Sequence, residues 1–182
     1  MSELEQQLVD LRARLASELR ERWRRDLPFD ELLSDRWERA RELGFGEGAS
    51  IYATSYVYGD VRVGAGTWIG PFTLLEGSAG IEIGSTCSIS AGVHIYTHDT
   101  VLWALSGGSA EPERKPVRIG DRCYIGPQTV VAAGVTIGDE CVVGACSFVN
   151  RNLPPRTVAA GIPCRAIGRV EIDGDRIELR YD

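Results

Sequence analysis

The chain has 182 residues, of which 43% are hydrophobic, enough for one buried core and too few for two full domains. Its 20 basic and 26 acidic residues leave a net charge of −6, which disfavours a non-specific nucleic-acid or anionic-membrane surface. No apolar run is long enough to span a membrane, and the acidic start does not resemble a secretion leader. We therefore expect a cytoplasmic protein with no membrane span and no nucleic-acid partner.

The first 47 residues predict a helical extension. All 21 glycines lie at or beyond Gly44, and the preceding segment is rich in Leu, Glu and Arg. Ser2 and Glu5 match a capping box, and the leucines that follow recur at spacings of three and four, as on one face of a helix. A second helix is expected from Asp30, its N-cap, to Leu43. The apolar stripe of the first helix is expected to pack against the rest of the chain or against a neighbouring subunit.

A six-residue period runs through most of the remaining chain. An aliphatic residue returns every six positions, with a small residue four positions after it. The aliphatic series is Ile51, Val57, Val63, Ile69, Leu75, Ile81, then Ile83, Ile89, Ile95, Val101, then Ile119, Ile125, Val131, Ile137, Val143 and Val149. A period of six fits neither a helix nor a simple alternating strand, so it indicates an internal repeat.

The five cysteines fit the same repeat. Three of them, Cys87, Cys123 and Cys141, occupy the small position, and no Cys-x-x-Cys pair is present. We interpret them as small apolar fillers and expect neither a disulfide framework nor a metal site.

The repeat resembles that of the hexapeptide-repeat acyltransferases, whose [Ile/Leu/Val]-Gly-x-x-small-x units each form one short strand and turn. The resemblance implies a mainly β fold, a left-handed parallel β-helix, for an acyltransferase domain over 48–168. This domain follows the helical extension over 1–47. A C-terminal hairpin tail over 169–182 is expected to turn at Asp173-Gly174. In this family three such β-helices associate, so the resemblance further implies a homotrimer.

The repeat pattern is lost between Val101 and Arg118 while its phase is kept, because 18 residues separate Val101 from Ile119. We therefore predict a protruding loop over 101–118, and a loop of this length inside a compact repeat is usually functional. It begins beside the only two histidines of the chain, His94 and His98.

The Thr97-His98-Asp99 motif resembles that of sugar O-acetyltransferases, in which a histidine at the base of such a loop is the general base. Imidazole, with a reference pKa of about 6.5, accepts a proton readily at neutral pH. The resemblance thus implies that His98 is catalytic. Asp99 either orients the ring or caps the loop, and His94 is expected to be structural.

The closing stretch of the repeat resembles that of the maltose and galactoside acetyltransferases and implies acetyl-CoA as the acyl donor. The implied donor-binding residues are the backbone at Gly126, Pro127 and Ala145 and the side chains of Asn150, Arg151 and Arg165. Backbone N–H groups near Gly126 are candidates to hold the oxyanion. Tyr124 stands where the family often has Trp at the acyl site. Glu76 is either an acceptor-contacting residue or a turn cap.

These residues predict an acetyl-CoA-dependent O-acyltransferase that acts on a sugar or polysaccharide precursor by direct transfer. One alternative is an N-acetyltransferase for a nucleotide-linked amino sugar, and another is a non-catalytic hexapeptide protein that binds or assembles. A zinc hydratase of the same fold is disfavoured because it needs three histidines, so we expect no metal.

Overall fold

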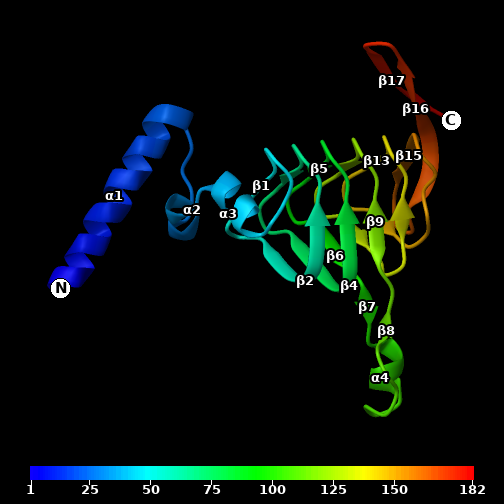
Figure 1. Cartoon of the computed structure of the whole chain (residues 1–182), viewed down its shortest axis with the longest axis horizontal. Coiled ribbons are helices and arrows are strands. Elements are labelled where there is room, and N and C mark those ends of the chain that lie inside the picture. Colours follow the sequence, from blue (N-terminus) through cyan, green and yellow to red (C-terminus); the bar gives the residue numbers. More distant parts are fainter.

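The computed structural model describes residues 1–182, and its centre is a column of short parallel strands stacked into a three-sided β-helix (Figure 1). One face is built by β1 (Ser50–Ile51), β3 (Trp68–Ile69), β5 (Ser88–Ile89), β10 (Tyr124–Ile125), β13 (Val142–Val143) and β15 (Thr157–Ala160). The other two faces are built by β2 (Tyr56–Val63), β4 (Leu74–Ile83), β6 (His94–Tyr96), β9 (Val117–Ile119), β11 (Val130–Val131), β12 (Thr136–Ile137) and β14 (Phe148–Val149). The predicted β-helix of hexapeptide repeats is therefore confirmed.

Strand β4 connects two faces of the column because it continues around a corner. Its first part, Leu74–Glu76, pairs in parallel with β6, and its last part, Ile81–Ile83, pairs in parallel with β9. Between β6 and β9 the chain leaves the column, so β4 holds both ends of the excursion in register.

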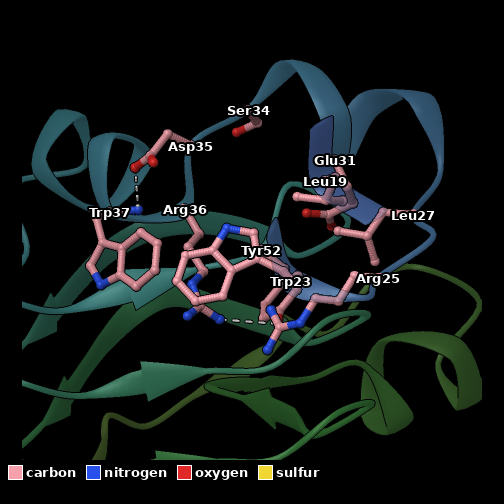
Figure 2. A pocket seen from close by; sticks show the side chains of 10 residues that line it. All are labelled: Leu19, Trp23, Arg25, Leu27, Glu31, Ser34, Asp35, Arg36, Trp37 and Tyr52. Carbon is pink, nitrogen blue, oxygen red and sulfur yellow. Dashed lines mark hydrogen bonds between the residues drawn. The ribbon is translucent and has the colours of Figure 1, made fainter. Parts of the chain in front are cut away.

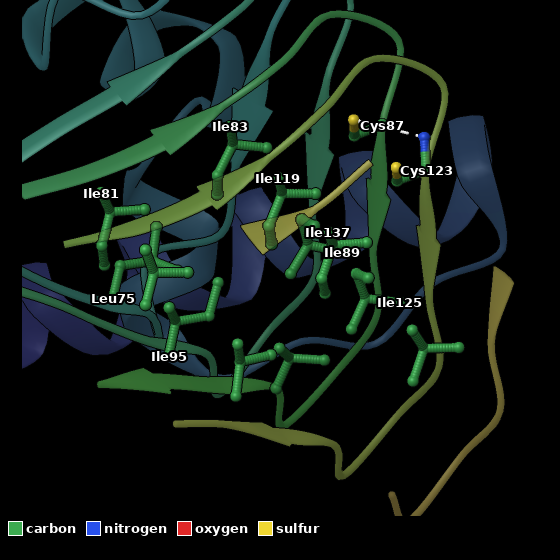
Figure 3. Packing of buried hydrophobic residues seen from close by; sticks show 14 of the residues in the cluster. Leu75, Ile81, Ile83, Cys87, Ile89, Ile95, Ile119, Cys123, Ile125 and Ile137 are labelled. Carbon is green, nitrogen blue, oxygen red and sulfur yellow. Dashed lines mark hydrogen bonds between the residues drawn. The ribbon is translucent and has the colours of Figure 1, made fainter. Parts of the chain in front are cut away.

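The aliphatic residues of the repeat fill the interior of the column (Figure 3). Ile69, Ile89 and Ile125 are completely buried, and they lie in register on neighbouring strands. The small positions are buried too, including those of Cys87, Cys123 and Cys141. Cys164 is also buried, but Cys146 is exposed at a turn, so the prediction of a buried filler is wrong for Cys146. Val101 is the exception in the predicted series, because it is 57% exposed and lies outside the column.

The N-terminal segment forms three helices where the sequence predicted two. Helix α1 (Glu3–Trp23) begins with the predicted capping box of Ser2 and Glu5. The predicted second helix is divided into α2 (Phe29–Leu33) and α3 (Arg36–Glu42). The break arises because Ser34 is extended and the Asp35 side chain accepts hydrogen bonds from the first N–H groups of α3. No helix is both long enough and apolar enough to cross a membrane.

These helices and the first coil enclose a small pocket (Figure 2). Arg36 donates a 3.1 Å hydrogen bond to the Tyr52 hydroxyl and stacks over the Trp37 ring. Glu31 accepts hydrogen bonds from the backbone and the hydroxyl of Thr54, which joins α2 to the first coil. These contacts anchor α2 and α3 at the start of the column.

The predicted loop over 101–118 contains regular structure and ends earlier than predicted. Strands β7 (His98–Asp99) and β8 (Glu113–Arg114) form an antiparallel pair at its base, and α4 (Val101–Leu105) lies beyond them. The column resumes at β9, whose Val117 is completely buried, so residues 117 and 118 belong to the coil. The structural reason is that β9 pairs with β4 from Val117 onward.

The tail is a hairpin of β16 (Arg165–Asp173) and β17 (Arg176–Tyr181), longer than the predicted one. Strand β16 begins early because it pairs antiparallel with β15. The turn lies at residues 174–175, one position later than predicted, since Asp173 pairs with Arg176.

Candidate functional site

His98 lies where the chain leaves the column. Thr97 is completely buried at the end of β6, and its carbonyl accepts a 2.8 Å hydrogen bond from Lys115 N–H. His98 then begins β7, opposite Arg114 of β8. Its Nδ1 atom is buried, while 35% of the side chain is exposed. The ring therefore presents its other edge, which carries Nε2, to the outside.

Glu76 lies directly behind this ring. Its Oε2 is 2.7 Å from His98 Nδ1, although the ring N–H is not aligned well enough for a regular hydrogen bond. Oε2 also accepts hydrogen bonds from the Thr97 backbone and hydroxyl, both 3.1 Å, and Oε1 accepts one from Ser78 N–H at 3.1 Å. The carboxylate is thus held in one orientation by the chain around it.

The surroundings of Glu76 keep it ionised. Burial by itself raises the pKa of this carboxyl, but hydrogen bonds from Ser78, the His98 contact and the Thr97 N–H together lower the pKa to about 2. An ionised carboxylate that faces Nδ1 favours the imidazole tautomer with its proton on Nδ1. Nε2 is then left with a free lone pair, as a general base requires.

Asp99, for which the sequence left two roles open, lies on the loop side of His98. Its Oδ1 accepts a 2.6 Å hydrogen bond from Val101 N–H, so the geometry is that of a cap on the loop. The residue facing the ring is Glu76, which the sequence analysis assigned to acceptor contact or turn capping. The pairing of Glu76 with Tyr96 across neighbouring coils is the signal that would have placed Glu76 beside His98.

His94 takes no part in this arrangement. It is half-buried on the outer surface of β6, and its Nδ1 lies 3.3 Å from the Tyr96 hydroxyl. The two rings meet edge to face.

The predicted donor-binding backbone lies on two stacked turns. Gly126 and Pro127 follow β10, Ala145 follows β13, and Cys146 N–H donates a 2.9 Å hydrogen bond to Pro127 O. Ala145 is exposed, and its N–H donates no hydrogen bond within the chain. It is therefore free to donate to a ligand amide.

Of the backbone N–H groups near Gly126, the predicted oxyanion donors, that of Gly126 itself is already engaged. Its N–H donates a 2.8 Å hydrogen bond to Val143 O in the ladder between coils. The Tyr124 side chain, two residues earlier, is 42% exposed on the outer surface of β10.

The predicted phosphate-binding side chains lie toward the C-terminal end of the column. Asn150 and Arg151 follow β14, and Arg165 begins β16; all three are exposed. A 2.8 Å hydrogen bond from Cys164 N–H to Phe148 O holds the segment before Arg165 against β14. Neither arginine forms an ion pair within the chain, although the Arg165 guanidinium donates a 2.7 Å hydrogen bond to Cys164 O. Both guanidinium groups keep N–H donors for an anion.

One chain does not bring His98 and the donor-binding backbone together. Pro127 and Ala145 lie at the turn that precedes β11 and β14, whereas His98 follows the end of β6, the neighbour of β11. The two groups thus lie at opposite edges of the same face of the column.

Comparison with known proteins relates the repeat region of the chain to one family. The profile described as bacterial transferase hexapeptide (six repeats) matches residues 116–151. The galactoside O-acetyltransferase of Escherichia coli K12 is 30% identical over 128 residues, which are 59% of this chain and 63% of that protein. The chain thus spans less than two thirds of this curated relative.

Two solved structures are similar over nearly their full length. One is a hexapeptide-repeat acetyltransferase, VCA0836, from Vibrio cholerae O1 biovar eltor, solved with acetyl coenzyme A. It is 29% identical, covers 92% of this chain and 90% of its own, and has a TM-score of 0.69. The other is a maltose O-acetyltransferase from Clostridium difficile 630, which is 30% identical, covers 94% of this chain and 90% of its own, and has a TM-score of 0.59. From the repeat, the fold and this extent of similarity, the chain belongs to the hexapeptide-repeat acyltransferase family.

Proposed function

We propose that the protein transfers an acetyl group from acetyl-CoA to a hydroxyl group of a sugar or polysaccharide precursor, with His98 as the general base. The observation that carries this proposal is the 2.7 Å approach of the Glu76 carboxylate to Nδ1 of a ring whose opposite edge is open. The V. cholerae relative was solved with acetyl coenzyme A, which supports acetyl-CoA as the donor. The E. coli and C. difficile relatives are named galactoside and maltose O-acetyltransferases, which supports a sugar hydroxyl as the acceptor.

The transfer is direct. His98 Nε2 takes the proton of the acceptor hydroxyl while the hydroxyl oxygen bonds to the thioester carbon. The carbon–sulfur bond then breaks, the acetyl group remains on the acceptor oxygen, and the sulfur leaves as a thiolate. The imidazolium returns its proton to that thiolate, so the enzyme ends in its starting state. Glu76 stabilises the transient positive charge on the ring.

The donor extends along the stacked turns toward the C-terminal end of the column. The free Ala145 N–H donates to an amide oxygen of the pantetheine arm. Arg151 and Arg165 pair with the phosphate oxygens of coenzyme A, and Asn150 contacts its nucleotide end. An acidic chain thereby binds a polyanion through local placement of its cations.

The proposed active assembly is a homotrimer with the site between neighbouring columns. Because His98 and the donor-binding turns lie at opposite edges of one face, a neighbouring subunit supplies the turn that faces His98. The same arrangement sets the exposed ring of Tyr124 beside the acyl group.

The test of the general base is thiol release from acetyl-CoA across a panel of sugars and nucleotide-linked amino sugars. We expect His98→Ala to lower turnover by about 10²- to 10⁴-fold, the usual contribution of a positioned base. His94→Ala is the matched control because it removes the only other imidazole, and it should stay within a few-fold of the unaltered protein. Full turnover by His98→Ala at neutral pH would show that the base is another group.

The panel also separates the remaining functions. Acetylation confined to nucleotide-linked amino sugars would assign N-acetyl transfer in place of O-acetyl transfer. No binding of coenzyme A at all would leave a non-catalytic binding or assembly protein.

The donor site has its own test. Arg165→Ala should raise the dissociation constant of coenzyme A by about tenfold, because it removes one guanidinium–phosphate pair. Arg169→Ala, on the same strand but paired with Glu171, should leave the constant unchanged. Equal affinity in both variants would mean that the phosphates bind elsewhere.

A further inference from the structure

Helix α1 carries an apolar stripe that one copy of the chain does not cover. The helix has 21 residues, stands clear of the column in Figure 1, and contains no buried residue. Its stripe, here called the leucine stripe, consists of Leu4, Leu8, Leu11 and Leu15. Leu4 is 65% exposed and Leu8 is 45% exposed, whereas Leu11 and Leu15 are half-buried. Because a solvated helix is stabilised mainly by packing its apolar face, the leucine stripe needs a cover.

The rest of the chain meets α1 at two places. Leu19 and Trp23, which follow the leucine stripe toward the C-terminal end of the helix, line the pocket of Figure 2, and the second contact lies on a different side. Val9, Ala13 and Ala16 line an open groove whose far wall is formed by Leu27 and Leu32. At 100° per residue, these positions lie beyond the edge of the leucine stripe. Contact with α2 therefore leaves the stripe open.

Charge is divided unequally along the same helix. Within residues 3–16, the part of α1 that carries the leucine stripe, residues 3–9 hold Glu3 and Glu5 and no basic side chain, whereas residues 10–16 hold Arg12 and Arg14 against Asp10. A second α1 that runs antiparallel places the acidic half of each helix beside the basic half of the other. A parallel copy places like charges together. The charge pattern thus selects an antiparallel copy of this helix as the occupant.

We propose that α1 pairs with α1 of a second copy of the chain, antiparallel, about a two-fold axis near residues 9 and 10. This axis sets Leu4 against Leu15 of the partner subunit and Leu8 against Leu11 of the partner subunit. Glu5 then lies on the same flank as Arg12 of the partner subunit. The interface is isologous, so every contact occurs twice. In a trimer, the pairing joins two trimers and doubles the assembly.

The first test measures mass in solution by sedimentation equilibrium. Leu8→Glu places a charge in the centre of the leucine stripe, at a position already 45% exposed in one copy, so helix content should be retained. We expect its mass to be half that of the unaltered protein. Gln6→Glu adds the same charge on the opposite face of α1 and should keep the full mass. An unchanged mass for Leu8→Glu would overturn the proposal.

The second test exchanges the charges that face each other. Glu5→Arg alone and Arg12→Glu alone each oppose like charges twice, so each should shift the equilibrium toward the half-mass species. The double variant restores opposite charges and should recover the full mass. The double variant, like Glu5→Arg alone, lacks the capping box of Ser2 and Glu5. If it nevertheless recovers the full mass, the loss of mass in Glu5→Arg is due to helix pairing and not to a weaker helix. A double variant no heavier than either single variant would exclude the antiparallel pairing. Neither test depends on the proposed acyl transfer.

Discussion

At the scale of single residues, the candidate site depends on a carboxylate that the chain keeps both charged and immobile. Glu76 accepts a hydrogen bond from Ser78 on Oε1 and one from the Thr97 backbone on Oε2, the oxygen that also faces the His98 ring. An imidazole without such a partner samples both tautomers and several orientations. The Glu76 contact therefore prepares Nε2 for proton transfer before the acceptor arrives.

Removing only the charge of this carboxylate tests that role. Glu76→Gln keeps the size of the side chain, and we expect the turnover number to fall about 10- to 100-fold. Glu82→Gln is the matched control, because Glu82 lies on the same strand and pairs only with the exposed Arg118. Initial rates at saturating acetyl-CoA measure both variants. Equal rates for the two would show that Glu76 does not act through His98.

The low pKa of Glu76 also predicts how stability responds to pH. Its pKa is about 2 in the folded chain against 4.5 in the unfolded chain, so the folded state holds the ionised form more strongly. The stabilisation is therefore complete above about pH 4.5 and is lost as the pH falls toward 2. Urea denaturation should show Glu76→Gln less stable than the unaltered protein by about 1–3 kcal/mol from pH 5 to 7. A difference that already shrinks between pH 7 and pH 5 would contradict this assignment.

At the scale of elements, the coils approach each other so closely at their turns that some positions have no room for a side chain. A methyl group on Gly64 would lie 2.6 Å from both Gly84 C and Ser85 N on the next coil. Backbone atoms cannot move aside as a flexible side chain does. Glycine here is a requirement of stacking.

We therefore expect Gly64→Ala to lower the free energy of unfolding by about 1–3 kcal/mol, through overpacking. Gly107→Ala is the comparison, since no atom lies within 4 Å of its added methyl group. Its positive φ alone costs about 1 kcal/mol. Thermal or urea denaturation of both variants measures their free energies of unfolding. A Gly64→Ala chain as stable as the unaltered protein would mean that the coils can separate without cost.

The sequence predicted those elements whose residues repeat in step with the fold. The aliphatic series from Ile51 to Val149, apart from Val101, could be assigned to the column because one residue in six must face inward. The break between α2 and α3 could not be predicted, because Asp35 is as acceptable within a helix as at its N-cap, and tertiary contacts decide between them. Likewise, the contact of Glu76 with His98 spans neighbouring coils, and local spacing does not reveal it.

At the scale of the whole molecule, a continuous ladder of hydrogen bonds contrasts with three parts that extend from it: α1, the loop beyond β7, and the terminal hairpin (Figure 1). Inside the column each coil is bonded to the coils on both sides. In α4, by contrast, the side chains of Leu102 and Leu105 are more than half exposed. Resistance to local opening should follow this division.

Amide hydrogen exchange is expected to reproduce the division. The central strands β5 and β10 should exchange slowest, through global unfolding only. Residues 106–112, at the tip of the loop, should exchange fastest, because only turns hold their backbone. Exchange followed by mass spectrometry gives the order. Protection of the tip equal to that of β5 would indicate that another part of the assembly covers the loop.

The way β4 spans a corner has a further consequence. Strand β4 pairs with β6, before the excursion, and with β9, after it. This one strand therefore keeps the two coils aligned where the chain leaves the column. The excursion can be shortened, lengthened or exchanged without altering the alignment of the scaffold on either side. The residues of the loop beside His98 can thus change, in evolution or by design, while the β-helix that supports them is retained.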